Sequence, residues 1–353
     1  MKNLRNFYKN KKILITGHTG FKGSWLAYAL KRFGAEVYGY SLKSNHFISN
    51  FKILNLDKDV KNIFADIRDK KSLNTTINRI NPDIIFHLAA QPLVKKSYED
   101  PELTIETNVN GTLNILNASR RCKNLKSLVI ITSDKCYKNK EKIIGYDEKD
   151  ELGGDDPYSG SKASAEIITR AYIESYLKFK KNLGTATARA GNVIGGGDWS
   201  ENRIIPDFII SILKNKKFFL RSPKSTRPWQ HVFDVIYGYL LLAKKIYNSN
   251  KYNGSYNFGP KKKEIMNVSQ IINYIKKKIK SKKKINIKKL KHFKETETLV
   301  LQSFKSKKIL KWGCNYSLKQ TLEETSDWYN TIIQKKNIKK ISEKQFGKYF
   351  LND

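Results

Sequence analysis

The feature that most limits the possible folds is the glycine-rich stretch GHTGFKG at residues 17–23. It follows a short apolar run, KILITG (12–17), and opens a helical pattern from Phe21 to Phe33 that ends at Gly34. Glycines in these places permit a tight turn and let a pyrophosphate approach the amides at a helix N-terminus. We therefore interpret it as a dinucleotide-binding turn rather than as ordinary turn chemistry. The expected cofactor contacts here are Gly17, Thr19, Gly20, Phe21, Lys22 and Gly23.

Strand and helix signals alternate through the first half of the chain. The further strand-like runs are AEVYGY (35–40), VKNIFAD (60–66), PDIIFHLAA (82–90), SLVIITS (127–133) and GTATARA (184–190). The helical patterns between them cover DKKSLNTTINRI (69–80), about 101–121 and 157 to about 180. Connections of this length suit crossovers between parallel strands. The predicted fold class is therefore α/β, a Rossmann-like doubly wound parallel sheet.

The regular alternation fails beyond residue 190, where Gly195, Gly196 and Gly197 are followed by loops marked with prolines. YNFGP (256–260) resembles a late strand that returns to the main sheet, and SLKQTLEETSDWYNTII predicts a single amphipathic helix at the end of the chain. We therefore expect a smaller, sequence-interleaved C-terminal domain for substrate binding. The expected boundaries are 1–190 for the nucleotide-binding domain, with 232–260 returning to it, and 191–231 with 261–353 for the substrate domain.

The formal net charge of +36 raises the question of a polyanionic partner. Lysine accounts for 11 of the 19 residues from Lys276 to Lys294, with hardly any interleaved arginine or aromatic residue. Lysine, isoleucine and asparagine are abundant throughout, so we interpret the charge as a compositional bias on solvated faces. We expect no nucleic-acid partner.

The three cysteines, Cys122, Cys136 and Cys314, are far apart and form no CxxC pair, so we expect no metal site and a reducing, cytoplasmic environment. The basic N-terminus lacks the apolar region of a secretory signal. No apolar stretch approaches the length of a membrane span, so we expect no membrane partner.

The second chemical motif is Tyr158-Ser159-Gly160-Ser161-Lys162. Asp156 and Pro157 suit the start of a helix, and the spacing of four residues places Tyr158 and Lys162 on one helical face. A nearby ammonium group favours the phenolate of a tyrosine, which is otherwise a poor base at neutral pH. Ser133 ends a strand some 25 residues upstream, and the three side chains together predict a reaction site.

These motifs resemble the extended short-chain dehydrogenase/reductase family, and within it the nucleotide-sugar 4,6-dehydratases. The stretches that carry the resemblance are GHTGFKGSWL, HLAAQPLVKKSYEDP, NVNGT, TSDKCY, DPYSGSKASAE, RAGNVIGGGDW, IPD and TRPWQHV. The resemblance implies a tightly held NAD, a cytoplasmic enzyme of deoxysugar or surface polysaccharide synthesis, and a homodimer or a dimer of dimers. A strand end of Ser41, Leu42 and Lys43, without an acid, leaves NADP open.

The resemblance also implies roles for individual residues. NAD would take the hydride from C4 of the sugar while Tyr158 removes the O4 proton. Lys162 would lower the pKa of Tyr158 and hold the nicotinamide ribose, and Ser133 would hydrogen-bond the O4 region. Asp134 would protonate the departing C6 hydroxyl. Lys135 would either remove the C5 proton or stabilise the resulting charge, and the Asp-Lys pair resembles the branch that acts on CDP-glucose. Asp66 would contact the adenine, or would cap the following helix. The remaining expected cofactor contacts are Ile67, Leu88, Ala89, Ala90 and Asn108.

The resemblance further implies substrate contacts from Gln91, Asn192, Arg203 and Arg227. For the two arginines, the planar guanidinium suits binding of a diphosphate. His87 ends an apolar strand and fits a core histidine better than a catalyst. A nucleotide-sugar 4-epimerase, or a dehydratase acting on another nucleotide-hexose, is the alternative function. The Asp134-Lys135 pair favours dehydration, because an epimerase needs no acid–base pair for elimination between C5 and C6.

Overall fold

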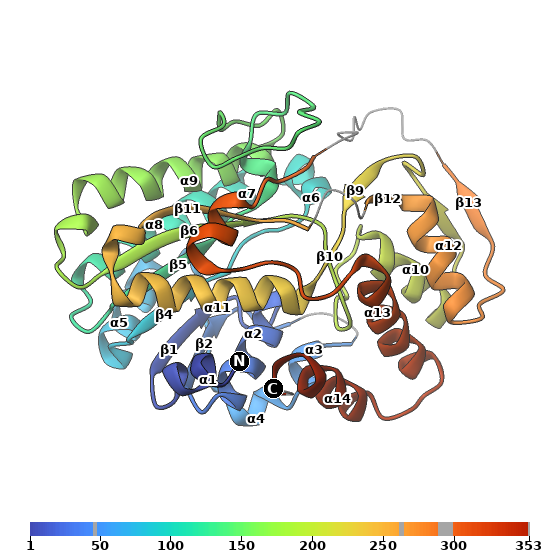
Figure 1. Ribbon diagram of the computed structural model, residues 1–353, viewed down its shortest axis with the longest axis horizontal. Coiled ribbons are helices and arrows are strands. Elements are labelled where there is room, and N and C mark those ends of the chain that lie inside the picture. The colour runs from blue at the N-terminus through green and yellow to red at the C-terminus, as the bar shows by residue number, and fades with distance from the viewer. Residues whose placement is uncertain (45–47, 261–264, 289–298, 352–353) are drawn as a thin grey trace.

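The computed structural model describes residues 1–44, 48–260, 265–288 and 299–351 (Figure 1). Parts of two sequence predictions lie outside the described residues. They are positions 289–294 of the lysine-rich run, and positions 261–264, 289–298 and 352–353 of the expected substrate domain.

Seven strands of the described chain form one parallel sheet, in the order β11-β6-β5-β4-β1-β2-β3. They are β1 (Lys12–Thr16), β2 (Glu36–Ser41), β3 (Lys61–Phe64), β4 (Ile84–His87), β5 (Ser127–Ile131), β6 (Gly184–Ala190) and β11 (Gly254–Phe258). The predicted doubly wound sheet is confirmed, including the return of the 256–260 segment to its edge. The strand order reverses between β1 and β4, which is where such sheets bind their ligands.

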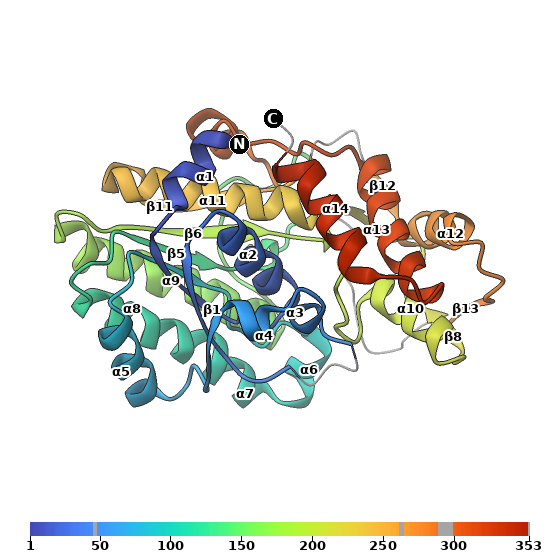
Figure 2. The same cartoon turned by 90° about the horizontal axis from the view of Figure 1, so that it is seen from below.

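Helices cover both faces of this sheet (Figure 2). In chain order they are α1 (Lys2–Tyr8), α2 (Phe21–Arg32), α3 (Asn50–Ile53), α4 (Leu56–Asp59), α5 (Lys70–Ile80), α6 (Val94–Glu99), α7 (Pro101–Ile105), α8 (Gly111–Arg121), α9 (Pro157–Ser175), α10 (Ile204–Leu213), α11 (Val232–Asn248), α12 (Val268–Lys278), α13 (Leu318–Ile333) and α14 (Ile338–Phe350). The helices α5, α8 and α9 lie on one face, and α1, α2 and α11 lie on the other.

Side chains of β1 alternate between the two faces, as expected for a strand buried on both sides. Ile13 and Ile15 are fully buried in the hydrophobic cluster that contains the apolar residues of α2 and α11. Leu14 points the other way, into the cluster that contains residues of α5 and α8. The continuous apolar run KILIT is therefore a central strand.

A smaller lobe lies beside the carboxyl ends of the sheet strands (Figure 1). It contains α10, α12 and α13 and short strand pairs made from β7 (Val193–Ile194), β8 (Phe218–Leu220), β9 (Thr226–Pro228), β10 (Gln230–His231), β12 (Ile265–Asn267) and β13 (Ile285–Ile287). Its core contains Trp199, Trp229 and Trp328.

The C-terminal segment corrects one sequence prediction, because it forms two helices and not one. The helix α13 ends at Ile333, and Lys335 takes a left-handed backbone conformation with φ of 53°. The Asn337 side chain then accepts a hydrogen bond from the Lys340 amide and starts α14. The residues of α13 pack into the smaller lobe, whereas Phe346 and Phe350 of α14 pack into the main cluster beside α2.

None of the helices in the described part of the chain is both long and apolar enough to span a bilayer.

Candidate active site

A cavity of about 940 Å³ lies at the carboxyl ends of the sheet strands, and residues of the smaller lobe line its other side. Its walls come from the loops after β1, β2, β3, β4, β5 and β6, from the start of α9, and from the segments around α10 and β9. The predicted site residues that line it are Gly17, Thr19, Gly20, Phe21, Lys22, Gly23, Asp66, Ile67, Leu88, Ala89, Ala90, Ser133, Asp134, Lys135, Tyr158, Lys162, Asn192, Arg203 and Arg227.

The glycine-rich turn packs too closely for side chains at two of its glycines. A Cβ atom at Gly23 would lie 2.1 Å from the Gly17 carbonyl oxygen, and one at Gly17 would lie 2.7 Å from the Ala89 amide. Gly17 also has a positive φ of 74°. Gly20 is the N-cap of α2 and has no side chain to occupy the first-turn amides, which suits an anion. The turn can therefore hold a pyrophosphate group.

Asp66 lines the cavity beyond β3, and its carboxylate is held by Arg68, whose Nη2 donates to Oδ2 at 2.7 Å. The hydrogen bonds from Arg68 keep the pKa of Asp66 below its ordinary value. The helix-capping alternative is not observed, because Asp69 caps α5 by accepting from the Ser72 amide. Asp66 is thus a fixed anion at the cavity edge.

Ser133, Tyr158 and Lys162 meet at one side of the cavity. Ser133 ends the segment after β5, and Tyr158 and Lys162 lie on the first turns of α9, which Asp156 caps by accepting from the Ser159 amide. Burial raises the pKa of Tyr158 to about 12, although a side-chain hydrogen bond with Ser133 opposes this effect. Burial also lowers the pKa of Lys162 to about 8.

Asp134 and Lys135 follow Ser133 in a short 3-10 turn, Asp134–Cys136. The Ser133 hydroxyl donates to Oδ1 of Asp134 at 2.9 Å and accepts from the Lys135 amide at 3.2 Å. Asp134 is buried, and Lys135 is half-buried. The pair of residues therefore lies in the same cavity as the tyrosine and lysine of α9.

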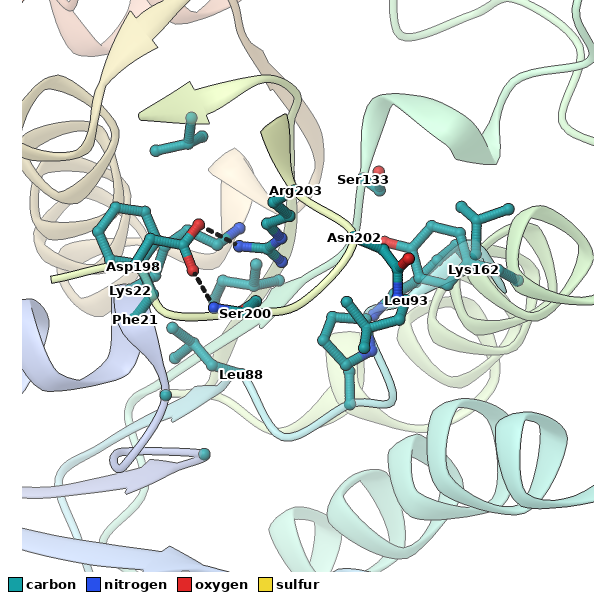
Figure 3. A pocket seen from close by; sticks show the side chains of 18 of the residues that line it. Phe21, Lys22, Leu88, Leu93, Ser133, Lys162, Asp198, Ser200, Asn202 and Arg203 are labelled. Carbon is teal, nitrogen blue, oxygen red and sulfur yellow. Dashed lines mark hydrogen bonds and ion pairs between the residues drawn. The ribbon is translucent and has the colours of Figure 1, made fainter. Parts of the chain in front are cut away.

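Asp198 and Arg203 are part of the wall contributed by the smaller lobe (Figure 3). Arg203 Nη1 donates to Oδ2 of Asp198 at 2.9 Å, and the Ser200 amide donates to Oδ1 at 3.1 Å. Lys22 extends from the glycine-rich turn into the same region. Burial, together with the charges of Arg203 and Lys162, lowers the pKa of Lys22 to about 7. The cavity therefore gathers cations from both parts of the chain.

Comparison with known protein families supplies the decisive observation. The model of the GDP-mannose 4,6 dehydratase family matches residues 14–325. This chain belongs to that family. The match agrees with the predicted resemblance to nucleotide-sugar 4,6-dehydratases, because it covers the glycine-rich turn, the YxxxK helix and most of the smaller lobe.

Two curated relatives match this chain, one of them over nearly its full length. The CDP-glucose 4,6-dehydratase of Salmonella typhimurium is 38% identical over 350 residues, covering 98% of each protein. The dTDP-D-glucose 4,6-dehydratase of Dictyostelium discoideum is 30% identical over 69% of this chain and 58% of its own length. The fold also matches the crystal structure of Thermotoga maritima UDP-glucose 4-epimerase, with a TM-score of 0.79, 22% identity, and coverage of 91% of this chain and 99% of the epimerase.

Two predicted site residues of this family member, Gln91 and Asn108, do not reach the cavity. Gln91 Nε2 donates to the Thr104 hydroxyl at 2.8 Å, and its Oε1 accepts from the Leu93 amide. Asn108 exchanges hydrogen bonds with the Gln91 backbone and donates to the Ser161 hydroxyl at 2.9 Å. These side chains join the loop after β4 to α9, so they support the cavity wall from behind.

The two tryptophans near the site differ in their surroundings. Trp229 lines the cavity and donates from Nε1 to the Met266 carbonyl at 3.0 Å. Trp199 packs against Trp328 and Tyr329 in the core of the smaller lobe. Trp229 is therefore the one of this pair that can contact a bound molecule.

His87 of the HLAAQP stretch and His231 of the TRPWQHV stretch are both buried. His87 bonds the Thr16 hydroxyl at 2.7 Å and the Thr112 hydroxyl at 3.2 Å, and burial lowers its pKa to about 3. His231 accepts from the Phe233 amide and caps α11. Both serve the packing of the fold, as expected for His87.

Sequence reasoning missed several residues that line the cavity, among them Asp198, Arg221 and Leu299. Asp198 stands in the GGGDW stretch five residues before Arg203, and this spacing of opposite charges was its only signal. Leu299 is about 70 residues from the nearest other lining residue in the sequence, Trp229, and no motif around it pointed to the site. Within the described residues, no cluster of three or more His, Cys, Asp or Glu side chains could hold a metal ion.

Proposed function

We propose that this chain is an NAD-dependent CDP-glucose 4,6-dehydratase, which converts CDP-glucose into CDP-4-keto-6-deoxyglucose. The observation that carries the proposal is the presence of Ser133, Tyr158 and Lys162 in one cavity with the Asp134–Lys135 pair. The 38% identity over 98% of the chain with the Salmonella enzyme supports the same activity.

The residues of the cavity fit a dinucleotide cofactor. The close approach of Gly17 and Gly23, and the first turn of α2, which no side chain caps, suit its pyrophosphate. Asp66 suits its adenine end. When bound, NAD would supply the hydride chemistry of the reaction, namely removal of a hydride from C4 of the sugar and its return to C6. The choice of NAD over NADP rests on the family resemblance, and extraction and analysis of the nucleotide bound to purified protein tests it.

We propose that Tyr158 takes the proton from the O4 hydroxyl. Its phenolic oxygen is buried beside the Ser133 hydroxyl, and the proton would leave more readily in the presence of a nearby cation. With a pKa of about 8, Lys162 is protonated at neutral pH and provides that charge. Ser133 would hydrogen-bond O4 as the C4 ketone forms.

The ketone at C4 acidifies the C5 proton, so water can leave across C5 and C6. We propose that Asp134 protonates the departing C6 hydroxyl, either with its own proton or with one that it relays from solvent. Lys135 has two possible roles in this step: it removes the C5 proton, or its ammonium stabilises the enolate charge. Both roles require the position that Lys135 occupies on the cavity wall.

The diphosphate of the substrate requires cations on the opposite wall. We propose Arg227 and Asn192 as contacts, with Arg203 as a further one, since all three line the cavity on the side of the smaller lobe. Asp198 already fixes the direction of the Arg203 guanidinium. Residues 191–231, which contain these three side chains, would thus belong to the substrate-binding portion of the chain.

Incubation of purified protein with CDP-glucose and with other nucleotide glucoses tests the activity. We expect a 4-keto-6-deoxy product from CDP-glucose, detected by mass spectrometry as the loss of water. A 4-epimer of unchanged mass would instead support the alternative epimerase function.

We also propose that the enzyme is cytoplasmic and forms dimers. The free cysteines suit a reducing compartment. Ile167 is exposed on α9, the helix through which related enzymes commonly pair, and Ile105 is exposed on α7, which contacts α9. Light scattering of the purified protein tests the assembly, and a mass equal to one chain would contradict it.

A further inference from the structure

A buried ion pair joins the helix of Tyr158 and Lys162 to the central sheet. Glu166 lies one turn beyond Lys162 on α9, and Arg189 lies on β6. Arg189 Nη2 donates to Oε2 of Glu166 at 2.7 Å, and the two side chains are only 3% and 1% exposed. This pair is not part of the cavity wall, so it contacts neither cofactor nor substrate directly.

The Glu166 carboxylate also accepts hydrogen bonds from three hydroxyl groups. Thr132 donates to Oε1, while Thr187 and Ser255 donate to Oε2 at 2.7 and 3.0 Å. The donors belong to the end of β5, to β6 and to β11. One carboxylate thus fixes α9 against three strands of the sheet.

Arg189 contacts the residue that follows the Ser133–Cys136 turn, which we call the reactive turn. Its Nη1 donates to the Tyr137 hydroxyl at 2.7 Å, and its guanidinium lies 4.9 Å from the centre of the Tyr137 ring. The Tyr137 hydroxyl in turn donates to Oδ1 of Asn257 at 2.8 Å. Thr132 and Tyr137 are the residues immediately before and after positions 133–136. The ion pair therefore holds the reactive turn at both of its ends.

We propose that Glu166 and Arg189 are positioning residues that hold the Ser133–Cys136 turn in register with Tyr158 and Lys162. The proposal rests on the proposed dehydratase function. In it, the ion pair aligns the side chains of the oxidation step, on α9, with Asp134 and Lys135, which serve the elimination step. Replacing a buried ion pair with apolar residues is often neutral or stabilising, so stability alone does not account for such a pair.

The charge of Glu166 also acts on Lys162. Burial lowers the pKa of Lys162, and the charges of Cys136 and Glu166 oppose that effect. Lys22 from α2 and His87 from β4 also interact electrostatically with Lys162. Removing the negative charge of Glu166 therefore lowers the pKa of Lys162, so Lys162 loses its proton at a lower pH.

Glu166→Gln in the full-length holoenzyme tests the proposal. We expect kcat with CDP-glucose to fall about tenfold or more, because charged hydrogen bonds of this strength are lost, while KM changes by less than about threefold. In a plot of kcat against pH, the alkaline limb should move to lower pH by about one unit. Hydrogen exchange of the backbone amides at 133–137 should become faster.

Two further variants separate positioning from general loss of stability. Tyr137→Phe keeps the charge of Glu166 but removes one anchor of the turn. It should leave the alkaline limb in place, speed amide exchange at 133–137, and let reduced cofactor accumulate. Asp234→Asn is the matched control, since Asp234 is a buried carboxylate that accepts from Tyr349 and Asn315 away from the cavity. It should lower the melting temperature without changing exchange at 133–137.

The proposal is overturned if Glu166→Gln shows the same amide hydrogen-exchange rates at 133–137 as the parent and the same kcat per folded molecule. If the parent forms the 4-keto product and Glu166→Gln matches it, the positioning role is wrong and the dehydratase function stands. If the parent forms no such product, the dehydratase function is wrong. The exchange rates still decide whether the pair holds the turn.

Discussion

Gly191 leaves the space that the carboxylate of Asp134 occupies. A Cβ atom at position 191 would lie 1.8 Å from Oδ2 of Asp134, far inside van der Waals contact. Gly191 directly follows β6, and Asp134 follows β5, so the two neighbouring strands meet at this point. The absence of a side chain at position 191 thus allows Asp134 to lie against the cavity floor.

Gly191→Ala should therefore displace the Asp134 carboxylate and slow the elimination step. We expect oxidation at C4 to continue, so reduced cofactor should accumulate during turnover and be visible by its absorbance. Gly347→Ala is the matched control, because a Cβ atom at Gly347 meets no atom within 4 Å. Equal steady-state levels of reduced cofactor in both variants would contradict the proposed role of Asp134.

Replacing Asp134 itself separates the two halves of the reaction. Asp134→Asn keeps the shape of the side chain but removes its acid, and we expect elimination to slow by a factor of about 100 or more. Tyr158→Phe should instead abolish oxidation, so no reduced cofactor should form at all. A stopped-flow record of cofactor absorbance distinguishes these results. Turnover of Asp134→Asn at the parental rate would show that the acid assignment is wrong.

Arg227→Met should weaken binding of the nucleotide sugar. Loss of a charged hydrogen bond costs about 1.5–3 kcal/mol, which corresponds to a rise in KM of roughly 10- to 150-fold. Arg121→Met is a suitable control, because Arg121 is exposed at the end of α8, away from the cavity. Steady-state kinetics with CDP-glucose measure the effect, and an unchanged KM in Arg227→Met would exclude it as a diphosphate contact.

Lys162 should lower the stability of the protein in the absence of cofactor and substrate. Folding lowers its pKa from 10.5 to about 8, so the unfolded chain binds more protons between these values, and stability rises with pH across that window. Below pH 8 the full cost of burying the charge is present, about 3 kcal/mol. Lys162→Met should therefore be inactive yet more stable at pH 7.

Urea unfolding of the apoprotein at pH 7 and at pH 9 measures this effect. The gain in free energy of unfolding from Lys162→Met should be smaller at pH 9, where the native lysine has already released its proton. If the variant is less stable than the parent at pH 7, contacts of the Lys162 ammonium in the parent stabilise the fold by more than its burial costs.

The main sheet could be predicted because its signals are local. Each strand is a short apolar run bounded by turn residues, and the glycine turn and the YxxxK helix stand at fixed places between such runs. The return of β11 to the sheet was also predictable, since YNFGP has the same apolar pattern. These local patterns determine which wall of the cavity each motif forms.

Contacts between distant segments could not be predicted in this way. Gln91 stands inside the HLAAQP motif, yet its side chain turns toward Thr104 because the backbone there bonds to Asn108. The Glu166–Arg189 pair joins two segments whose separate patterns gave no sign of a partner. The division of the last segment into α13 and α14 depends on the Asn337 cap, which a continuous amphipathic pattern conceals.

The central claim, dehydration rather than epimerisation, is tested most directly with CDP-glucose that carries deuterium at C4. Dehydration returns the hydride removed from C4 to C6, so the deuterium should appear in the C6 methyl group of a 4-keto-6-deoxy product, as read by NMR. Deuterium retained at C4 of a sugar that still has its C6 hydroxyl would contradict the account.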